Sequence, residues 1–152
     1  MHNIIIRRAK KKDCPRLLEF VNELAKFQQA EKEVTISFKH FEGSGFGENP
    51  VWWGFVADVD GEIQGMAIYY IRFSTWKGKQ LYLEDLYISE KMRRTGIGTL
   101  LFEQLIIEVK EKELNGIAWQ VAEWNESAIQ FYKKCHADFN PQKIDCYLDL
   151  HR

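Results

Sequence analysis

One continuous stretch, residues 81–102, limits the folds open to this chain more than any other part of it. Its first half, Leu81–Ile88, is rich in aromatic and branched residues, contains no Gly or Pro, and is short enough for a strand buried on both faces. A basic segment with two glycines, Arg93–Gly98, follows, and residues 99–110 then repeat apolar side chains at helical spacing. The stretch therefore predicts a strand, a glycine-containing turn and a helix.

A turn of this kind is suited to binding an anion. The N–H groups of the first helical turn have no partner inside the helix, and the helix dipole places partial positive charge there. Gly96 and Gly98 allow a ligand to approach the backbone closely or allow a positive φ. Arg93 and Arg94 add groups that match phosphate geometry. The alternative interpretation is a surface loop that merely contains glycines and arginines.

The spacing of the glycines separates this turn from two common phosphate-binding motifs. A P-loop requires Gly-Lys-Ser/Thr at its end, which is absent here. A dinucleotide fingerprint requires its third glycine at position 101, which is Leu101, and it usually opens the first βαβ unit of a chain. What remains is Arg-x-x-Gly-x-Gly after an acidic strand.

The composition is that of an ordinary globular protein. We expect one domain, residues 1–152, since 45% of the residues are hydrophobic, 28% are charged and the net charge is −1. These values give no electrostatic case for a nucleic acid or a membrane as the main partner. The odd number of cysteines without a CxxC pattern argues against a disulfide framework or a zinc site and favours the reducing cytoplasm. No apolar run approaches the ~20 residues that span a bilayer.

Periodicity and turn signals predict an α+β fold with a mixed sheet and helices on its faces. Asp60-Gly61 is a strong two-residue hairpin signal. The strands are expected at residues 3–7, 51–59, 62–73, 81–88, 117–122 and 144–150. The helices are expected at residues 13–29, at 36–41, where glycines at 43, 45 and 47 end the helix, at 99–110 and at 127–135.

Four motifs, in this order and spacing, point to one family. They are Tyr82–Asp85, Arg93–Gly98, Ala122–Asn125 and Phe131–Lys133. Together they resemble the GNAT superfamily of acyl-CoA-dependent N-acetyltransferases, in the branch that holds the diamine and spermidine/spermine N-acetyltransferases. The resemblance implies a mixed, mostly antiparallel sheet flanked by about four helices. It also implies acetyl-CoA as cosubstrate, no metal, and a small-molecule amine as acceptor.

Within that branch, Ser74–Lys79 is most similar to the thialysine N-ε-acetyltransferases. The polyamine enzymes carry acidic residues where this chain has Ser74 and Gln28, and the segment after Ala137 is shorter than theirs. A long polycation needs several carboxylates along its length, so the resemblance favours a shorter amine such as thialysine, a lysine-like amino acid or a diamine. Polyamine acetylation, protein-lysine acetylation and a non-catalytic acyl-CoA sensor are the alternatives.

Acetyl transfer to an amine requires a carboxylate near the acceptor. A lysine-type amine has a pKa of about 10.4, so well under ~1% of it is neutral at pH 7, and a base must help to remove its proton. Glu84, on the strand beside the cofactor, is the proposed base by position and by resemblance. Asp85 points to the other face of a regular strand, unless a bulge intervenes. The alternative for both carboxylates is a structural ion pair or an edge charge.

Tyr132 is the residue that the resemblance assigns as general acid. A phenol near the sulfur can protonate the departing coenzyme A thiolate. Without the resemblance, Phe131-Tyr132 in a helix is more typical of core packing.

The resemblance also implies where the two substrates bind. Backbone groups of the strand would pair with the pantetheine arm, turn amides would hold the diphosphate, and Asn125 would contact the cofactor or serve as a plain N-cap. The cofactor-binding set is Leu86, Tyr87, Ile88, Arg93, Arg94, Thr95, Gly96, Ile97, Gly98, Thr99, Asn125 and Ser127. The amine-binding set is Phe27, Gln28, Trp76, Glu84, Asp85 and Trp119, whose aromatic members are alternatively core residues. The family usually forms homodimers.

Overall fold

The computed structural model describes residues 2–150. Contacts group the chain into two compact units, one up to Gln120 and one from Val121. The first unit holds β1 (Ile4–Arg8), η1 (Lys11–Asp13), α1 (Cys14–Phe27), η2 (Glu31–Glu33), α2 (Phe38–Phe46), β2 (Trp53–Val59), β3 (Glu62–Ser74), β4 (Gly78–Ile88), η3 (Glu90–Met92), α3 (Ile97–Glu111) and β5 (Ile117–Trp119). The second unit holds α4 (Glu126–Lys134).

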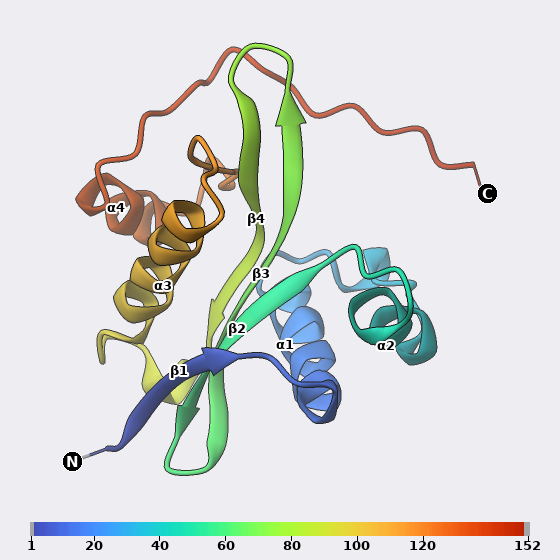
Figure 1. The fold of residues 1–152 in the computed structure, drawn as a ribbon, viewed down its shortest axis with the longest axis vertical. Helices are drawn as coiled ribbons and strands as arrows, with labels where there is room; N and C mark the ends of the chain where they lie inside the picture. Colours follow the sequence, from blue (N-terminus) through green and yellow to red (C-terminus); the bar gives the residue numbers. More distant parts are fainter. Residues whose placement is uncertain (1, 151–152) are drawn as a thin grey trace. The chain divides into compact units, whose positions relative to one another are not determined.

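The five strands form one mixed sheet in the order β1-β2-β3-β4-β5, antiparallel except for the parallel pair β4–β5 (Figure 1). The predicted Asp60-Gly61 turn joins β2 to β3, with φ of 53° and 91° at its two residues. Asp58 Oδ1 accepts a hydrogen bond from the Gly61 N–H and so supports the turn. The predicted α+β class with a mostly antiparallel sheet is confirmed. Among the described residues, no helix is both long and apolar enough to cross a membrane.

Helices cover both faces of this sheet, with α1 and α2 on one side and α3 on the other (Figure 1). Leu17 and Phe20 of α1 are fully buried and belong to one core cluster with Met66 and Tyr87 of the sheet. On the α3 side, Gly65 lies so close to the helix that an added Cβ would contact Ile97 and Leu101 at 3.1 and 3.3 Å. The core therefore fixes α3, and with it the turn that precedes α3, against β3 and β4.

The predicted helix 36–41 is wrong at its C-terminal end, because α2 runs through Gly43 and Gly45 to Phe46. Ser37 caps its start by accepting a hydrogen bond from the His40 N–H. Position 45 must be a glycine for steric reasons, because a Cβ there would clash with the Trp52 ring. Gly45 therefore makes room for the Trp52 ring and does not end the helix.

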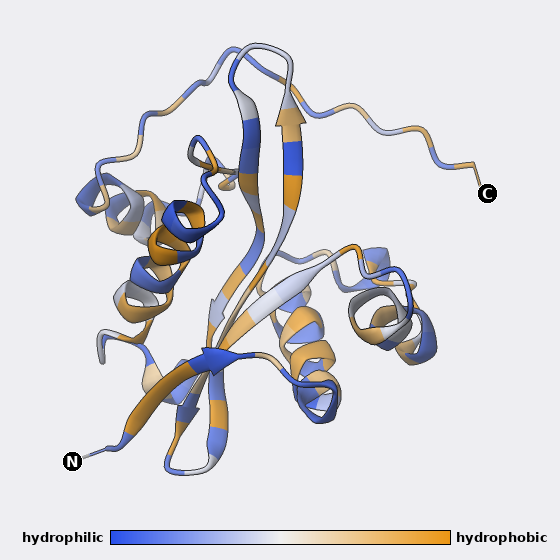
Figure 2. Ribbon diagram, in the orientation of Figure 1, coloured by the Kyte–Doolittle hydropathy of each residue, from blue (hydrophilic) through white to orange (hydrophobic). Residues whose placement is uncertain are grey.

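The predicted strand 144–150 is also wrong. In the second unit this segment forms no strand, and its apolar side chains are exposed: 88% for Ile144, 68% for Leu148 and 81% for Leu150. Figure 2 shows hydrophobic and hydrophilic residues alternating along it. The alternation is suitable for a strand, but a strand also needs a neighbouring edge for its backbone hydrogen bonds. The predicted strand 117–122 is shorter than expected and ends at Trp119.

Candidate active site

A bulge in β4 organises the candidate acceptor site. Ile68 pairs with Asp85 and Tyr69 pairs with Leu83, so Glu84 has no residue opposite it. A regular strand would have placed Glu84 and Asp85 on opposite faces. The extra residue cancels that alternation, and Asp85 comes to the same face as Ile68, which packs in the core beside α1.

The bulge brings both carboxylates together on that face. Tyr70, two residues after Ile68, pairs with Tyr82, and their rings lie 5.1 Å apart. Glu84 is two residues after Tyr82 and therefore lies on the same face of the strand as Tyr82. The two carboxylates therefore lie beside a pair of tyrosines, in the part of the sheet that faces α1 and α2.

The pKa shifts of Asp85 and Tyr70 agree with this arrangement. Burial raises the pKa of half-buried Asp85 to about 7, and the negative charge of Glu84 raises it further. Burial raises the pKa of Tyr70; Glu84 adds to this increase and the Arg72 guanidinium opposes it. Glu84 itself is exposed. The site thus offers one solvated carboxylate and one carboxyl group that titrates near neutral pH.

A second feature is the edge of β4 beyond Leu83. β5 pairs with β4 only at Leu81, Tyr82 and Leu83. From Glu84 to Ile88, the backbone on that edge has no partner strand within the described residues. An exposed edge of this kind can accept an extended, amide-containing molecule as an added strand.

The turn before α3 presents a row of free backbone donors. Gly96 is the N-cap with φ 88°, and Arg94 also has a positive φ, 65°. Among residues 2–150, the N–H groups of residues 94–99 donate no hydrogen bond. Residues 93–96 are exposed, so no side chain covers the turn. This geometry fits the diphosphate of a nucleotide cofactor.

Arg93 is directed to a different place from Arg94. Its Nε donates to the Ile88 carbonyl at 3.2 Å, and its guanidinium lies 5.5 Å from the Tyr87 ring and 5.8 Å from the Phe27 ring. Arg93 therefore connects the end of β4 to the end of α1. Gln28, the C-cap of α1, follows Phe27 directly.

The two tryptophans predicted to bind the amine lie far from each other in the fold. Trp76 is in the turn between β3 and β4 and is 88% exposed. Ser74 Oγ accepts a hydrogen bond from the backbone N–H of Trp76. The Trp119 ring packs against Phe102 of α3 at 5.4 Å. That contact places Trp119 on the α3 face, opposite the face that carries Glu84.

In the second unit, the structure describes local contacts of the remaining predicted residues. Asn125 is the N-cap of α4, and its Oδ1 accepts the Ala128 N–H at 3.2 Å. Ser127 lies in the first turn of α4. Tyr132 follows within the helix, with its ring 5.4 Å from that of Phe131. Their catalytic and cofactor roles stay predictions.

Sequence reasoning missed a buried polar network that connects α3 to the sheet. Glu108 of α3 is 2% exposed and accepts two hydrogen bonds of 3.0 Å from Arg8. The hydroxyl of Tyr69 also donates to Glu108. Burial and this hydrogen bond raise the pKa of Tyr69 to about 12, with Arg8 acting against them. No residue spacing signals the network, because its members come from β1, β3 and α3.

Comparison with known proteins shows which family the chain resembles. Residues 17–137 match the acetyltransferase (GNAT) family. The chain is 34% identical over 141 residues to a thialysine N-ε-acetyltransferase of Sus scrofa, covering 88% of this chain and 83% of the relative. It is 35% identical over 136 residues to the Mus musculus protein of the same name, covering 84% and 80%. A solved aminoglycoside acetyltransferase from an uncultured soil sample, in complex with sisomicin, shares the fold with a TM-score of 0.78 at 18% identity, over 97% of this chain and 96% of that chain.

Proposed function

We propose that the acceptor of this protein is a small primary amine with a lysine-like end. The premise is that the chain belongs to the GNAT family of acetyltransferases and is an acetyl-CoA-dependent N-acetyltransferase. The observation that carries the proposal is the pair of carboxylates at the β4 bulge. They adjoin an unpaired strand edge and, farther along the chain, a turn with free N–H donors. The names of its relatives suggest thialysine as the first acceptor to test.

The proposed cofactor site follows β4 into α3. The free edge at Leu86, Tyr87 and Ile88 would pair with the pantetheine arm. The N–H groups of residues 94–99, with the positive end of α3, would hold the diphosphate, and Arg94 would add charge. When bound, acetyl-CoA supplies a thioester whose carbonyl carbon accepts the amine nitrogen.

The acceptor must lose protons to react. Glu84, which is exposed, would attract the substrate ammonium and orient it at the bulge. Asp85, with its pKa raised to about 7, is suited to accept a proton, directly or through water, near physiological pH. As the C–N bond forms, the C–S bond breaks, and Tyr132 would give its phenol proton to the thiolate. The thiol leaves as free coenzyme A.

We propose a homodimer in the cytoplasm as the functional form. The exposed apolar side chains of residues 144–150 are compatible with an interface between copies. Cys14, Cys135 and Cys146 are free thiols, which agrees with a reducing compartment.

An amine panel tests the proposed acceptor class. The purified protein is incubated with acetyl-CoA and, separately, with thialysine, lysine, putrescine or spermidine, and the released thiol is measured. We expect the fastest release with thialysine. Equal or faster release with spermidine would reassign the chain to polyamines. Tight binding of acetyl-CoA without release of thiol for any amine would indicate a non-catalytic sensor.

A further inference from the structure

One face of the β3–β4 hairpin carries side chains whose charge changes sign along the strands. Tyr70 pairs with Tyr82, and two residues farther along β3, Arg72 pairs with Gln80. Residues two apart on a strand share a face. The row therefore runs from the carboxylates at the bulge, past two tyrosines, to a guanidinium.

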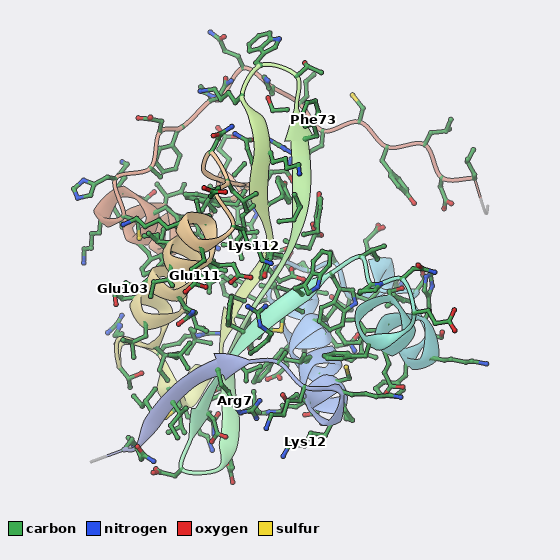
Figure 3. The ribbon with its side chains drawn as sticks, in the orientation of Figure 1. Arg7, Lys12, Phe73, Glu103, Glu111 and Lys112 are labelled. Carbon is green, nitrogen blue, oxygen red and sulfur yellow. The ribbon has the colours of Figure 1, made fainter. Side chains whose placement is uncertain are left out.

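The Arg72 side chain is held in a defined place. Its Cζ lies 4.9 Å from the centroid of the Tyr82 ring, and one Nη donates to Gln80 Oε1 at 3.2 Å. The contact with Tyr82 holds the guanidinium on the side of the hairpin that carries the tyrosines. Phe73, the next residue, lies near the end of the hairpin (Figure 3), and strand alternation puts it on the opposite face.

Arg72 has no acidic partner inside the described protein. Among residues 2–150, neither Arg72, Glu84 nor Asp85 forms an ion pair within 4.0 Å. Arg72 is exposed, and a guanidinium has five N–H donors in a planar fork that matches a carboxylate. Burial and the charge of Glu84 raise the pKa of Tyr70 and the charge of Arg72 lowers it, so both charged groups act on this tyrosine.

The distances suit a short dipolar molecule. Neighbouring same-face positions on a strand are about 7 Å apart, which is the separation expected between Glu84 and Tyr82. In an extended lysine or thialysine, six bonds separate the side-chain nitrogen from the carboxylate carbon, which is also about 7 Å. An acceptor with its ammonium at the bulge would extend along the tyrosines and bring its carboxylate to the guanidinium over Tyr82.

We infer that Arg72 binds the carboxylate of an amino-acid acceptor whose side-chain ammonium lies at Glu84 and Asp85. This inference rests on the proposed function and narrows it to amino acids, as opposed to diamines and polyamines. A diamine would bring only a second ammonium to the positive charge of Arg72, whereas an amino acid brings a carboxylate beside its α-ammonium and so offers the guanidinium a partner. Arg72 is thus a specificity-determining residue.

Two ligands that differ only in the carboxylate test the inference. Thialysine and bis(2-aminoethyl) sulfide, its decarboxylated counterpart, are titrated by calorimetry into the protein with coenzyme A present. The same two molecules are then used as acceptors with acetyl-CoA. In Arg72→Gln, we expect the Kd and KM of thialysine to rise about 10- to 100-fold, since one charge-assisted interaction is lost. The Kd of the diamine stays unchanged or falls, and Arg72→Lys recovers part of the thialysine affinity.

Lys79→Gln is the matched control, because it removes the same charge from the opposite face of the same hairpin. It should leave both affinities unchanged. Equal losses for both ligands in Arg72→Gln, or no loss for either, would overturn the inference, as would a wild-type protein that binds both equally well. Carboxylate-dependent binding without acetyl transfer would support the role of Arg72 and refute the proposed function, so the two failures are distinguishable.

Discussion

Two adjacent carboxylates in β4 have different surroundings and therefore different chemistry. Glu84 is exposed, whereas Asp85 is half-buried, and burial together with the neighbouring charge of Glu84 raises its pKa to about 7. A group that titrates near the working pH can both accept and release a proton. The resemblance points to Glu84 as base, and the raised pKa of Asp85 is the reason for proposing it as a second proton acceptor.

The raised pKa of Asp85 predicts a pH-dependent cost to folding. Its ordinary value is 3.8 and its folded value about 7, so the folded state binds the proton more tightly and stability falls as pH rises between these values. We expect Asp85→Asn to increase the free energy of unfolding by about 1–3 kcal/mol at pH 8.5, after allowance for remaining solvation. The gain should vanish near pH 3.5. Urea unfolding at a series of pH values measures it.

Asp13→Asn is the control with the opposite sign. Burial acts to raise the pKa of Asp13, but the hydrogen bonds from Arg7 and from the Lys10 N–H outweigh burial and lower it. Asp13 therefore stabilises the fold above its unfolded pKa, and this contribution is lost as pH falls through the folded pKa. The substitution should destabilise at neutral pH. If Asp85→Asn showed the same sign and pH profile, the assignment of a raised pKa would be wrong.

Tyr132→Phe tests the proposed acid. The substitution removes only the hydroxyl, and we expect kcat for thialysine to fall at least tenfold, a bound set below the ~10²–10⁴ typical of general acid catalysis. The affinity for acetyl-CoA should hardly change, since the turn at residues 94–99 is intact. Tyr147→Phe removes an exposed hydroxyl from the same unit and should leave kcat unchanged. Wild-type turnover by Tyr132→Phe at every pH would exclude the role.

At the scale of elements, contacts at both ends of α3 fix the helix to the sheet. The hydrogen bonds of Glu108 with Tyr69 and Arg8 fix its C-terminal half to the sheet, and the close packing at Gly65 fixes its first turns. These contacts hold the N-terminus of α3, and with it the free N–H groups before the helix, in one position relative to the sheet. A preorganised anion site loses less entropy when its ligand binds.

The turn itself depends on Gly96. With φ 88°, an Ala at this position costs about 1 kcal/mol of stability. Because an added Cβ meets nothing within 4 Å, the cost comes from the backbone and not from a clash. We expect Gly96→Ala to weaken acetyl-CoA binding at least fivefold through a distorted turn, as measured by calorimetry.

Gly116→Ala is the matched control, since its Cβ also meets nothing within 4 Å but its φ is not positive. It should leave the affinity for acetyl-CoA unchanged. Similar losses in the two variants, or none in Gly96→Ala, would mean that the conformation of the turn does not determine cofactor binding.

At the scale of the whole molecule, the sequence predicted most of the elements but not their fine register. The stretch 81–102 was sufficient for β4, the turn and α3, because strand and helix periodicities are local properties. The bulge at Glu84 was not predictable, since it is defined by the pairing of β3 with β4. The extent of α2 depends on Trp52, which fills the space beside Gly45, and such a contact has no local signal.

The site shows the same division. The free N–H groups near Gly96 followed from the motif, whereas the place of Arg72 beside Tyr82 follows only from the hairpin register. Trp119, expected near the amine, packs against Phe102 on the other face because it pairs with Leu83, which pairs in turn with Tyr69 on the α3 side of the sheet. Local patterns therefore predicted the geometry of the turn before α3 better than the arrangement of side chains around the bulge.

The exposed C-terminal segment leads to a prediction about assembly. Residues 144–150 alternate apolar and polar side chains without a strand neighbour among the described residues, and such segments tend to pair with another chain. We expect the 18.0 kDa chain to have about twice that mass in solution, by light scattering after size-exclusion chromatography. Ile144→Ser with Leu148→Ser should weaken the dimer at least tenfold, because two apolar side chains per copy lose their burial.

Asp145→Ser with Asp149→Ser makes the same number of changes in the same segment, on the alternate face, and should leave the dimer intact. If both double variants dissociate equally, the segment contributes through its backbone or through charge, and the apolar face is not what associates. If neither dissociates while the wild type is a dimer, the interface lies elsewhere. If the apolar variant alone becomes monomeric and keeps its far-ultraviolet circular dichroism, the unpaired strand pattern is explained by a partner copy, since each chain then supplies the neighbour that the other lacks.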